Sequence, residues 1–497
     1  MGEDEDRDRF SDRGTDGWDF SDDNSHDDSQ VPDTLEESAM AYLPAGASHR
    51  HHNNMEQPHF LPAFLVVLVF GLVFLGAGLI DVFDSFLICL WGVHFFGVLP
   101  LLLTLETPII AWGTIDKSTI DDAHHDLPIY SILVPVYREA NMLSQMAKGL
   151  AALDYPSDRL DIIILLESDD KRTYQAAQAI NWPAGTNLLV VPDGVLRNKP
   201  RACNYGLKQA RGAFLVIYDA EDIPHPQQLR AAIARFETDT DKLACLQSPL
   251  CILPNHHGWL ESHFLLEYRQ LFGVILPVLC MFNMPIPLGG TSNHFKTSIL
   301  RAIGGWDPWN LTEDADIGLR LALEGYKIAM IDVPTFENAP HSVKIWMHQR
   351  TRWLSGHIQT LGTHGFVFDD WIIRRGLLAT LSMISILLCR LLSGVLTMCC
   401  GVLTLCAVLG IRPWHSSTIF IYIALGVYVG IFVVNMRLLR DFPIRHRLFI
   451  VFTTPFYWLM TNPAFARACW RIATGNLKWI KTPHKPHTGT HRPNKIK

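Results

Sequence analysis

Residues 131–139 read SILVPVYRE, an apolar run that ends abruptly in polar side chains. A short run of this kind, rich in β-branched residues, is typical of a buried strand. Similar runs follow at 160–166 (LDIIILL), 188–191 (LLVV) and 214–218 (FLVIY), and helix-like segments at 141–153 and 170–180 separate the first three. This alternation predicts an α/β domain with a mainly parallel sheet covered by helices on both faces. In such sheets ligands bind at the carboxyl ends of the strands.

Acidic residues follow three of these strands, and the first of them is Glu139, after the first strand. ESDD (167–170) comes after the second and DAED (219–222) after the fourth. Asp170 has a structural alternative, because an aspartate here often caps the next helix. Three carboxylates within four residues repel one another unless a cation compensates, and a hard divalent ion also binds substrate phosphates. We therefore favour Asp219, Glu221 and Asp222 as candidate metal ligands over a solvated turn.

Positive charge enters through NKPRACN (198–204), which precedes a helix. Alone, Lys199 and Arg201 describe an ordinary basic loop. Beside the acidic segments they fit a site that holds a diphosphate and a metal ion together, since those groups need cationic partners.

Three later motifs carry further candidates. In GGTSNHF (289–295) two glycines permit close approach of the backbone to a ligand. In TEDAD (312–316) the threonine is a potential helix cap, and Asp314 falls in the first helical turn, at the ligand edge of the sheet. QRTRW (349–353) has two interpretations. It is an anchor at the membrane interface, or Arg352 binds phosphate and Trp353 stacks on a sugar.

Long apolar stretches predict membrane helices. They lie at 60–80, 86–105, 376–411, 419–436 and 448–466, and the first is long enough to cross a ~30 Å hydrocarbon core. Lys/Arg placement predicts cytoplasmic ends and a cytoplasmic middle. The basic segment 437–447 and the basic tail both favour the cytoplasmic side of the membrane. Three single crossings would put the tail outside, so one C-terminal stretch must be a hairpin or re-entrant. Pro455 and Asn462-Pro463 make the last stretch the candidate.

Composition limits the function classes. The 497 residues are 48% hydrophobic and only 18% charged, which excludes an intrinsically disordered chain overall. Residues 1–40 hold fifteen acidic and three basic residues, so the remainder is mildly basic despite a net charge of −7. That balance suits anionic lipid or anionic ligands and gives no nucleic-acid footprint. The ten cysteines form no CxxC pair, and buried thiols are the expected role.

In their order, the seven motifs resemble membrane-bound family 2 glycosyltransferases, a group that includes bacterial cellulose synthase and related exopolysaccharide synthases. The resemblance covers roughly residues 129–353 and rests on VPVYRE, ESDD, NKPRACN, DAED, GGTSNHF, TED and QRTRW. The last two match the TED and QxxRW patterns of the family in full.

The resemblance implies a GT-A-like fold, an inverting transfer and Mg²⁺ or Mn²⁺ as cofactor. It implies that Asp314, with Thr312 and Glu313 of the same motif, supplies the general base. It implies a nucleotide-sugar site, UDP-sugar most of all, formed by Tyr137, Glu139, Asp169, Lys199, Arg201, Asp219 and Arg352. Asp219 takes the first position of the metal motif and Glu221, not an aspartate, the second. The acceptor glycan would contact Gln349, Trp353, Asn293 and His294.

The resulting organisation is a disordered acidic tail (1–58), two transmembrane helices (59–113), a cytoplasmic GT-A domain with interfacial helices (114–375), transmembrane or re-entrant helices (376–470) and a basic tail (471–497). The tail segment 479–484 is a gating segment or a membrane-surface tail. We expect the helix at 259–278 at the membrane surface, and Arg390 either lines a sugar path or snorkels to the interface.

The leading hypothesis is a processive synthase of a β-linked polysaccharide in the inner (plasma) membrane, which also exports its product. The alternative is a single-addition enzyme that glycosylates a lipid or glycolipid. A transporter or receptor leaves TED and DAED without a role, and a hydrolase explains neither the spans nor the basic residues. The sequence specifies no protein partner.

Overall fold

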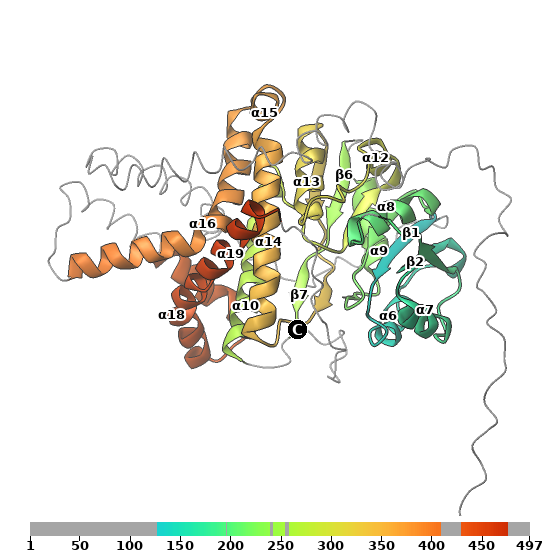
Figure 1. Ribbon diagram of the computed structural model, residues 1–497, viewed down its shortest axis with the longest axis horizontal. Helices are drawn as coiled ribbons and strands as arrows, with labels where there is room; N and C mark the ends of the chain where they lie inside the picture. The colour runs from blue at the N-terminus through green and yellow to red at the C-terminus, as the bar shows by residue number, and fades with distance from the viewer. Residues whose placement is uncertain (1–126, 195, 239–241, 254–257, 409–428, 476–497) are drawn as a thin grey trace, which may run out of the picture.

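The computed structural model describes residues 127–194, 196–238, 242–253, 258–408 and 429–475 (Figure 1). The acidic tail, the apolar stretches at 60–80 and 86–105 and the segment at 479–484 lie outside these residues. Figure 1 shows a β-sheet with its covering helices on one side of the molecule and a group of long helices on the other.

The larger sheet has seven strands in the order β3-β2-β1-β4-β8-β6-β9. Its strands are β1 (Tyr130–Val136), β2 (Leu160–Glu167), β3 (Thr186–Val191), β4 (Phe214–Ile217), β6 (Leu243–Gln247), β8 (Asn293–Lys296) and β9 (Lys327–Met330). The smaller sheet has the order β5-β10-β7 and consists of β5 (Ile223–Pro224), β7 (Leu250–Ile252) and β10 (Thr335–Glu337).

All four predicted strands are present, and the prediction of a mainly parallel sheet is confirmed. β1 pairs in parallel with β2 and β4, β2 with β3, and β6 with β9, whereas β8 runs antiparallel to both β4 and β6. Successive residues of β1 enter opposite hydrophobic clusters, with Leu133 in one and Ile132 and Val134 in the other. The unbroken apolar run is therefore required, because both faces of the strand are buried.

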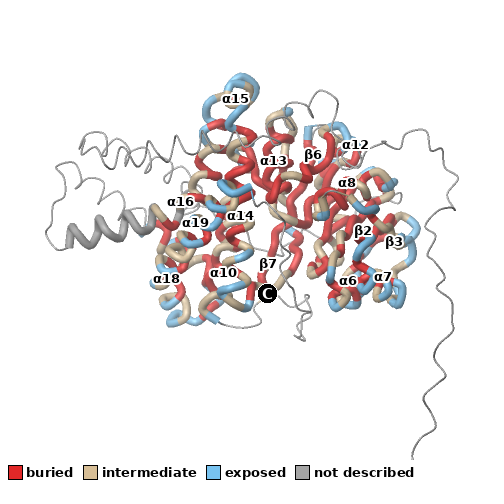
Figure 2. The backbone as a smooth tube through the Cα atoms, in the orientation of Figure 1, coloured by how far each residue is buried: buried red, intermediate tan, exposed pale blue. Residues whose placement is uncertain are grey.

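Helices connect the strands and form the second half of the molecule. Those around the sheet are α6 (Leu143–Ala151), α7 (Lys171–Gln178), α8 (Lys199–Gln209), α9 (Gln228–Glu237), α12 (Thr297–Ala302) and α13 (Glu313–Leu323). Those on the other side are α10 (Trp259–Gln270), α11 (Leu276–Met281), α14 (Val343–Gly365), α15 (Phe368–Arg375), α16 (Leu377–Val408), α18 (Ile444–Leu459) and α19 (Thr461–Ala473). Figure 2 shows buried residues in the sheet and along α14, and exposed residues at the tip of α15.

The segment expected as a helix at the membrane surface is one helix that contains a π-helical turn, and it packs against other elements of the protein. α10 and α11 are joined by a π-helical turn, η2 (Leu271–Ile275), and α10 packs against β7 and α18. Trp259–Met281 is also the one helix of the described residues long and apolar enough to cross a membrane, with a mean hydropathy of 1.5. In its most apolar 18 residues, 61% are buried inside the protein. The helix can therefore be a membrane span or a core helix by its length and composition.

The C-terminal apolar stretches are helical wherever they are described. α16 follows the predicted start of its stretch closely, and Val429–Leu438 is a shorter apolar helix. The last stretch is broken as expected: α18 ends at Leu459 and α19 begins at Thr461, beside the predicted Asn462-Pro463 break, whereas Pro455 lies inside α18. With 16 residues, α18 is about 24 Å long and too short to cross a membrane unaided. Multiple membrane crossings stay a prediction.

Candidate active site

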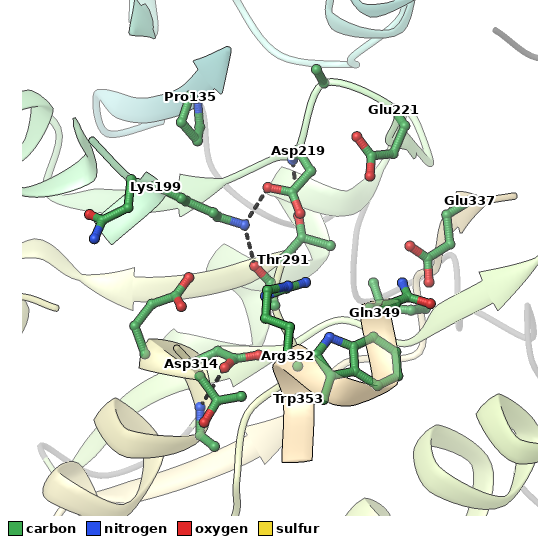
Figure 3. A pocket seen from close by; sticks show the side chains of 18 of the residues that line it. Pro135, Lys199, Asp219, Glu221, Thr291, Asp314, Glu337, Gln349, Arg352 and Trp353 are labelled. Carbon is green, nitrogen blue, oxygen red and sulfur yellow. Dashed lines mark hydrogen bonds and ion pairs between the residues drawn. The ribbon is translucent and has the colours of Figure 1, made fainter. Parts of the chain in front are cut away.

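A pocket opens where the carboxyl ends of β1, β2 and β4 meet α8, α10, α13, α14 and α16 (Figure 3). This is the edge of the sheet at which the sequence predicts ligand binding. Eleven of the sixteen predicted site residues line it: Tyr137, Glu139, Lys199, Asp219, Glu221, Thr312, Glu313, Asp314, Gln349, Arg352 and Trp353. The other five, which do not, are Asp169, Arg201, Asp222, Asn293 and His294.

Lys199 lies at the centre of the acidic side of the pocket. It is the first residue of α8, after the N-cap Asn198, whose side chain accepts a hydrogen bond from the amide of Arg201 at 3.1 Å. The lysine Nζ donates to the Asp219 carboxylate and to the carbonyl of Gly290, the latter at 2.5 Å (Figure 3). The pKa of Lys199 is raised because the negative charges of Asp219 and Glu313 outweigh the cost of burial. Lys199 therefore stays charged throughout the physiological pH range.

Asp222 supports the loop instead of facing the pocket. It is 2% exposed and accepts hydrogen bonds from the amide of Asp219, at 2.7 Å, and from the hydroxyl of Thr291. Asp222 is therefore not placed to bind a metal ion in the pocket, whereas Glu221, another of the predicted metal ligands, lines the pocket. A buried carboxylate next to a turn amide fixes that turn, so Asp222 orients Asp219 toward the cavity.

Glu337 is a pocket carboxylate that sequence reasoning missed. It ends the three-residue strand β10, so no long apolar run marks it. Burial, then the negative charges of Glu221 and Asp219, raise its pKa to about 8. In Figure 3 Glu221 and Glu337 lie on the same side of the cavity. Within the described ranges, no three His, Cys, Asp or Glu residues converge closely enough to hold an ion.

The TED motif starts α13 at the opposite side of the cavity (Figure 3). Thr312 occupies the N-cap position, but its hydroxyl contacts Asn310 and Thr360, each at 3.3 Å, and makes no capping bond, so the capping interpretation is wrong. Burial raises the pKa of Asp314, against the cations Lys199 and Arg352. Burial and the charge of Asp314 raise the pKa of Glu313 to about 7. The two first-turn carboxylates thus compete for one negative charge.

The QRTRW residues come from the middle of α14 and place Gln349, Arg352 and Trp353 on the cavity wall (Figure 3). Arg352 reaches the carbonyl of Leu311, just before the TED motif, at 3.5 Å. It therefore lies between the general-base candidate and the remainder of the pocket, a position suited to a negatively charged leaving group.

Arg350, the neighbouring arginine of the same motif, supports Trp353 from behind. Its guanidinium lies 4.8 Å from the Trp353 ring centroid and donates two hydrogen bonds to Glu267 of α10. The hydroxyl of Tyr457 in α18 donates to the same carboxylate at 2.8 Å. Three helices are thus joined beneath Trp353 by a buried polar network, which fixes the indole as a platform.

The residues after β1 and β2 form the far end of the pocket. Tyr137 lines it and donates a hydrogen bond to Asp169 at 3.1 Å, and Arg197 donates to that same carboxylate at 3.1 Å. The acid after β2 that itself lines the pocket is Glu167, which the sequence analysis did not single out. Burial raises the pKa of Glu167 to about 7.

Asp170 and the predicted binding residue Arg201 have structural roles in this region. Asp170 caps α7, because its carboxylate accepts from the Thr173 amide at 3.2 Å, as its structural interpretation predicted. Arg201 is 3% exposed, lies 3.7 Å from Glu167 and donates to the carbonyl of Pro192 at 2.6 Å. It supports the wall of the pocket from behind.

Asn293 and His294 belong to the sheet core. His294 Nδ1 lies 2.7 Å from the Tyr130 hydroxyl and Nε2 lies 3.2 Å from the Gln228 oxygen. Burial lowers the pKa of His294 to about 3, so it is neutral. Asn293 donates to the carbonyl of Gly289 at 2.7 Å and so shapes the glycine loop that lines the pocket. A strand residue between two neighbouring strands has no route to a ligand beyond the strand ends.

Two further lining residues extend the pocket past Trp353. His357 lies one turn further along α14, and Arg390 projects from α16. For Arg390 the structure supports the interpretation that this arginine lines the cavity. His357 carried no sequence signal, since it follows the QRTRW motif without belonging to it.

Comparisons with known proteins agree with the resemblance. Residues 214–435 match the family model described as glycosyl transferase family group 2. A probable glycosyltransferase, YdaM, of Bacillus subtilis (strain 168) is 25% identical over 47% of this chain and 56% of its own length. A probable glucomannan 4-beta-mannosyltransferase 9 of Oryza sativa subsp. japonica is 26% identical over 54% of this chain and 53% of its own.

Cellulose synthase 2 of Novacetimonas hansenii is 26% identical over 48% of this chain and 15% of its own length. The chain thus spans about half the length of the first two relatives and much less of the third. The family match and the relatives together confirm the relationship to family 2 glycosyltransferases of the cellulose-synthase-like kind.

Proposed function

Because the chain is related to the family 2 glycosyltransferases, we propose that it transfers a sugar, with inversion, from a nucleotide-sugar donor to a growing β-linked polysaccharide. The observation that carries the proposal is that residues from five separate motifs line one pocket. Tyr137, Lys199, Asp219, Asp314 and Arg352 come from five segments spread over more than 200 residues of the chain. The mainly parallel sheet with its one antiparallel strand, β8, supports a GT-A-like domain as the scaffold.

The chemistry follows from the positions of the charges. An acceptor hydroxyl must lose its proton as it attacks the anomeric carbon, and Asp314 is the carboxylate that takes this proton. Lys199 and Arg352 stabilise the negative charge that develops on the departing nucleoside diphosphate. A single displacement with one base inverts the anomeric centre, so an α-linked donor gives a β-linked product.

A divalent cation fits the acidic side of the pocket. Asp219, Glu221 and Glu337 are oxygen donors of the kind that Mg²⁺ and Mn²⁺ prefer, and, after burial, the negative charges of Glu221 and Asp219 raise the pKa of Glu337, an effect that a cation would offset. Asp219 and Glu221 would hold the ion, with Glu337 beside them. When bound, such an ion neutralises charge on the donor diphosphate.

Elongation of a polymer is favoured over a single addition by the shape of the site. Trp353, His357 and Arg390 line the same pocket as Asp314, so an acceptor glycan has further side chains to contact beside the general-base candidate. Arg390 belongs to α16, an apolar helix, and this supports passage of the product toward the membrane. Transfer to a lipid or glycolipid stays the second candidate, since an apolar helix also borders the pocket.

The test uses the full chain in nanodiscs with Mg²⁺ or Mn²⁺. We would measure nucleoside diphosphate release and radiolabelled product with GDP-mannose, UDP-glucose, UDP-N-acetylglucosamine, UDP-galactose and UDP-glucuronate. Asp314→Asn is expected to lower turnover by about 10³-fold with any active donor, since general-base catalysis is worth about 10²–10⁴. Asp370→Asn, an acid in α15 outside the pocket, is the control. Equal rates for the wild type and Asp314→Asn would contradict the proposal.

A further inference from the structure

His357 is held in a single tautomer by its own helix. Its Nδ1 lies 2.6 Å from the carbonyl oxygen of Trp353, one turn earlier in α14. A carbonyl only accepts hydrogen bonds, so Nδ1 carries the proton and Nε2 presents a lone pair. The side chain is 5% exposed, and burial, assisted by the charges of Arg390 and Arg350, lowers its pKa to about 3. His357 is therefore a neutral hydrogen-bond acceptor at every working pH.

Two buried acceptor atoms on this helix await a donor. Within the part of the chain that the structure describes, neither His357 Nε2 nor Gln349 Oε1 has a hydrogen-bond partner. Both residues line the same pocket as Trp353. An unsatisfied buried acceptor costs about 1–3 kcal/mol, so a ligand that brings hydrogen-bond donors gains from this arrangement.

We propose that His357 Nε2 accepts a hydrogen bond from a hydroxyl of an acceptor sugar that stacks on Trp353, with Gln349 as a second acceptor. The inference rests on the proposed function and adds a specificity residue to it. A lone pair attracts a hydroxyl and repels a carboxylate or phosphate oxygen. The group that faces His357 is therefore a hydrogen-bond donor, and a hydroxyl is the donor that an acceptor sugar supplies there.

The spacing along α14 supports a shared ligand. Trp353 and His357 are four residues apart, so their side chains lie on the same face of the helix, and Gln349 lies four residues before Trp353. An aromatic face between two hydrogen-bond acceptors matches a pyranose ring, which offers an apolar face and hydroxyls at its rim.

The experiment measures binding, not turnover, and uses the full chain in nanodiscs. Calorimetry with β-1,4-linked mannohexaose and cellohexaose compares the wild type, His357→Leu and His357→Gln. The leucine fills the volume without an acceptor, and the glutamine amide oxygen replaces one near Nε2. His348→Leu, at an exposed position of α14, is the matched control.

We expect His357→Leu to raise the Kd of the more tightly bound oligosaccharide about tenfold, which is the effect of one lost hydrogen bond. The glutamine variant should stay within about threefold of the wild type, and the control should match it. If the leucine variant does not fold, His357→Met takes its place, since its thioether is a weak acceptor of similar size.

Three results would overturn the inference: neither oligosaccharide binds the wild type, the leucine variant binds as tightly as the wild type, or the glutamine variant is as weak as the leucine variant. The last of these is the mark of a merely structural role. Donor turnover is measured separately, so loss of the proposed function shows as absent nucleotide release and is distinguishable from loss of this binding contact.

Discussion

At the scale of single residues, the site depends on how charge is shared between Lys199 and the carboxylates. Lys199 contacts Asp219 directly, and its positive charge also lowers the pKa of Asp314 and of Glu313. Burial acts in the opposite direction and raises both. The pH at which the base becomes active is therefore set by the balance between burial and the nearby cations Lys199 and Arg352.

This balance predicts a pH dependence. The base must be ionised, so kcat/KM for nucleotide release should rise with pH through the raised pKa of the Glu313–Asp314 pair and be lost below it. Lys199→Gln removes the cation that favours ionisation, so the rising limb should move to higher pH, in addition to a loss of rate.

The measurement is a pH–rate profile of kcat/KM with the active donor. Lys208→Gln, at the other end of α8, is the control and should leave the limb in place. A limb that stays fixed or moves to lower pH in Lys199→Gln would show that the lysine does not control ionisation of the base.

At the scale of elements, the contact between α14 and the TED motif sets the distance between Arg352 and Asp314. Gly356 of α14 lies against Thr312, and a Cβ at this glycine would come within 2.7 Å of the Thr312 backbone nitrogen. Helix backbones approach this closely only where no side chain intervenes. The glycine is thus a packing requirement of the site, although it touches no ligand position.

Gly356→Ala is expected to push α14 away from Thr312 and lower nucleotide release at least about 10²-fold, because small misplacements of catalytic groups have effects of that size. Gly365→Ala is the matched control, since the same helix has nothing within 4 Å of a Cβ there. It should keep nearly full activity. The test is to measure nucleotide release by the two purified variants under the same conditions. Equal activity of the two variants would refute the packing argument.

The elements also show what the sequence predicts and what it does not. β1, β2 and β4 are readable because each is an apolar run that is almost fully buried, and β3 is readable from its LLVV run although only Val191 of this edge strand is buried. Glu337 and Glu267 escape notice because their position depends on tertiary packing: one ends a three-residue strand, and the other belongs to a helix that reads as apolar. The prediction that His294 contacts the acceptor is wrong, because a motif does not reveal which of its residues face the pocket and which face the core of the sheet.

At the scale of the whole molecule, the pocket joins the sheet to the helical half. Residues at the ends of β1 and β4, for which we propose nucleotide binding, line the same pocket as residues of α10, α14 and α16, for which we propose acceptor binding. The network of Arg350, Glu267 and Tyr457 connects the acceptor side to α18, so Trp353 is fixed by helices distant in sequence. These contacts join residues that are far apart in the sequence, so no local sequence pattern predicts them. The order of the motifs along the chain, in contrast, can be read directly from the sequence.

The proposed processive elongation predicts a particular distribution of product lengths. With a labelled oligosaccharide in large excess over enzyme, early time points should contain a few long products beside unextended primer. A single-addition enzyme gives one uniform step instead. Trp353→Ala removes the stacking surface, which is worth about 1 kcal/mol or more, so product release should accelerate several-fold and mean product length should fall by a similar factor.

Gel analysis of the products against total nucleotide release separates chain length from rate. Trp470→Ala is the control, because this tryptophan is 71% exposed and lies outside the pocket. Trp353→Ala should shorten the chains more than it slows release of nucleotide, since the platform holds the polymer and does not take part in bond formation. If the rate falls while chain length stays constant, Trp353 acts on the chemical step, and the acceptor platform must be sought elsewhere along the pocket.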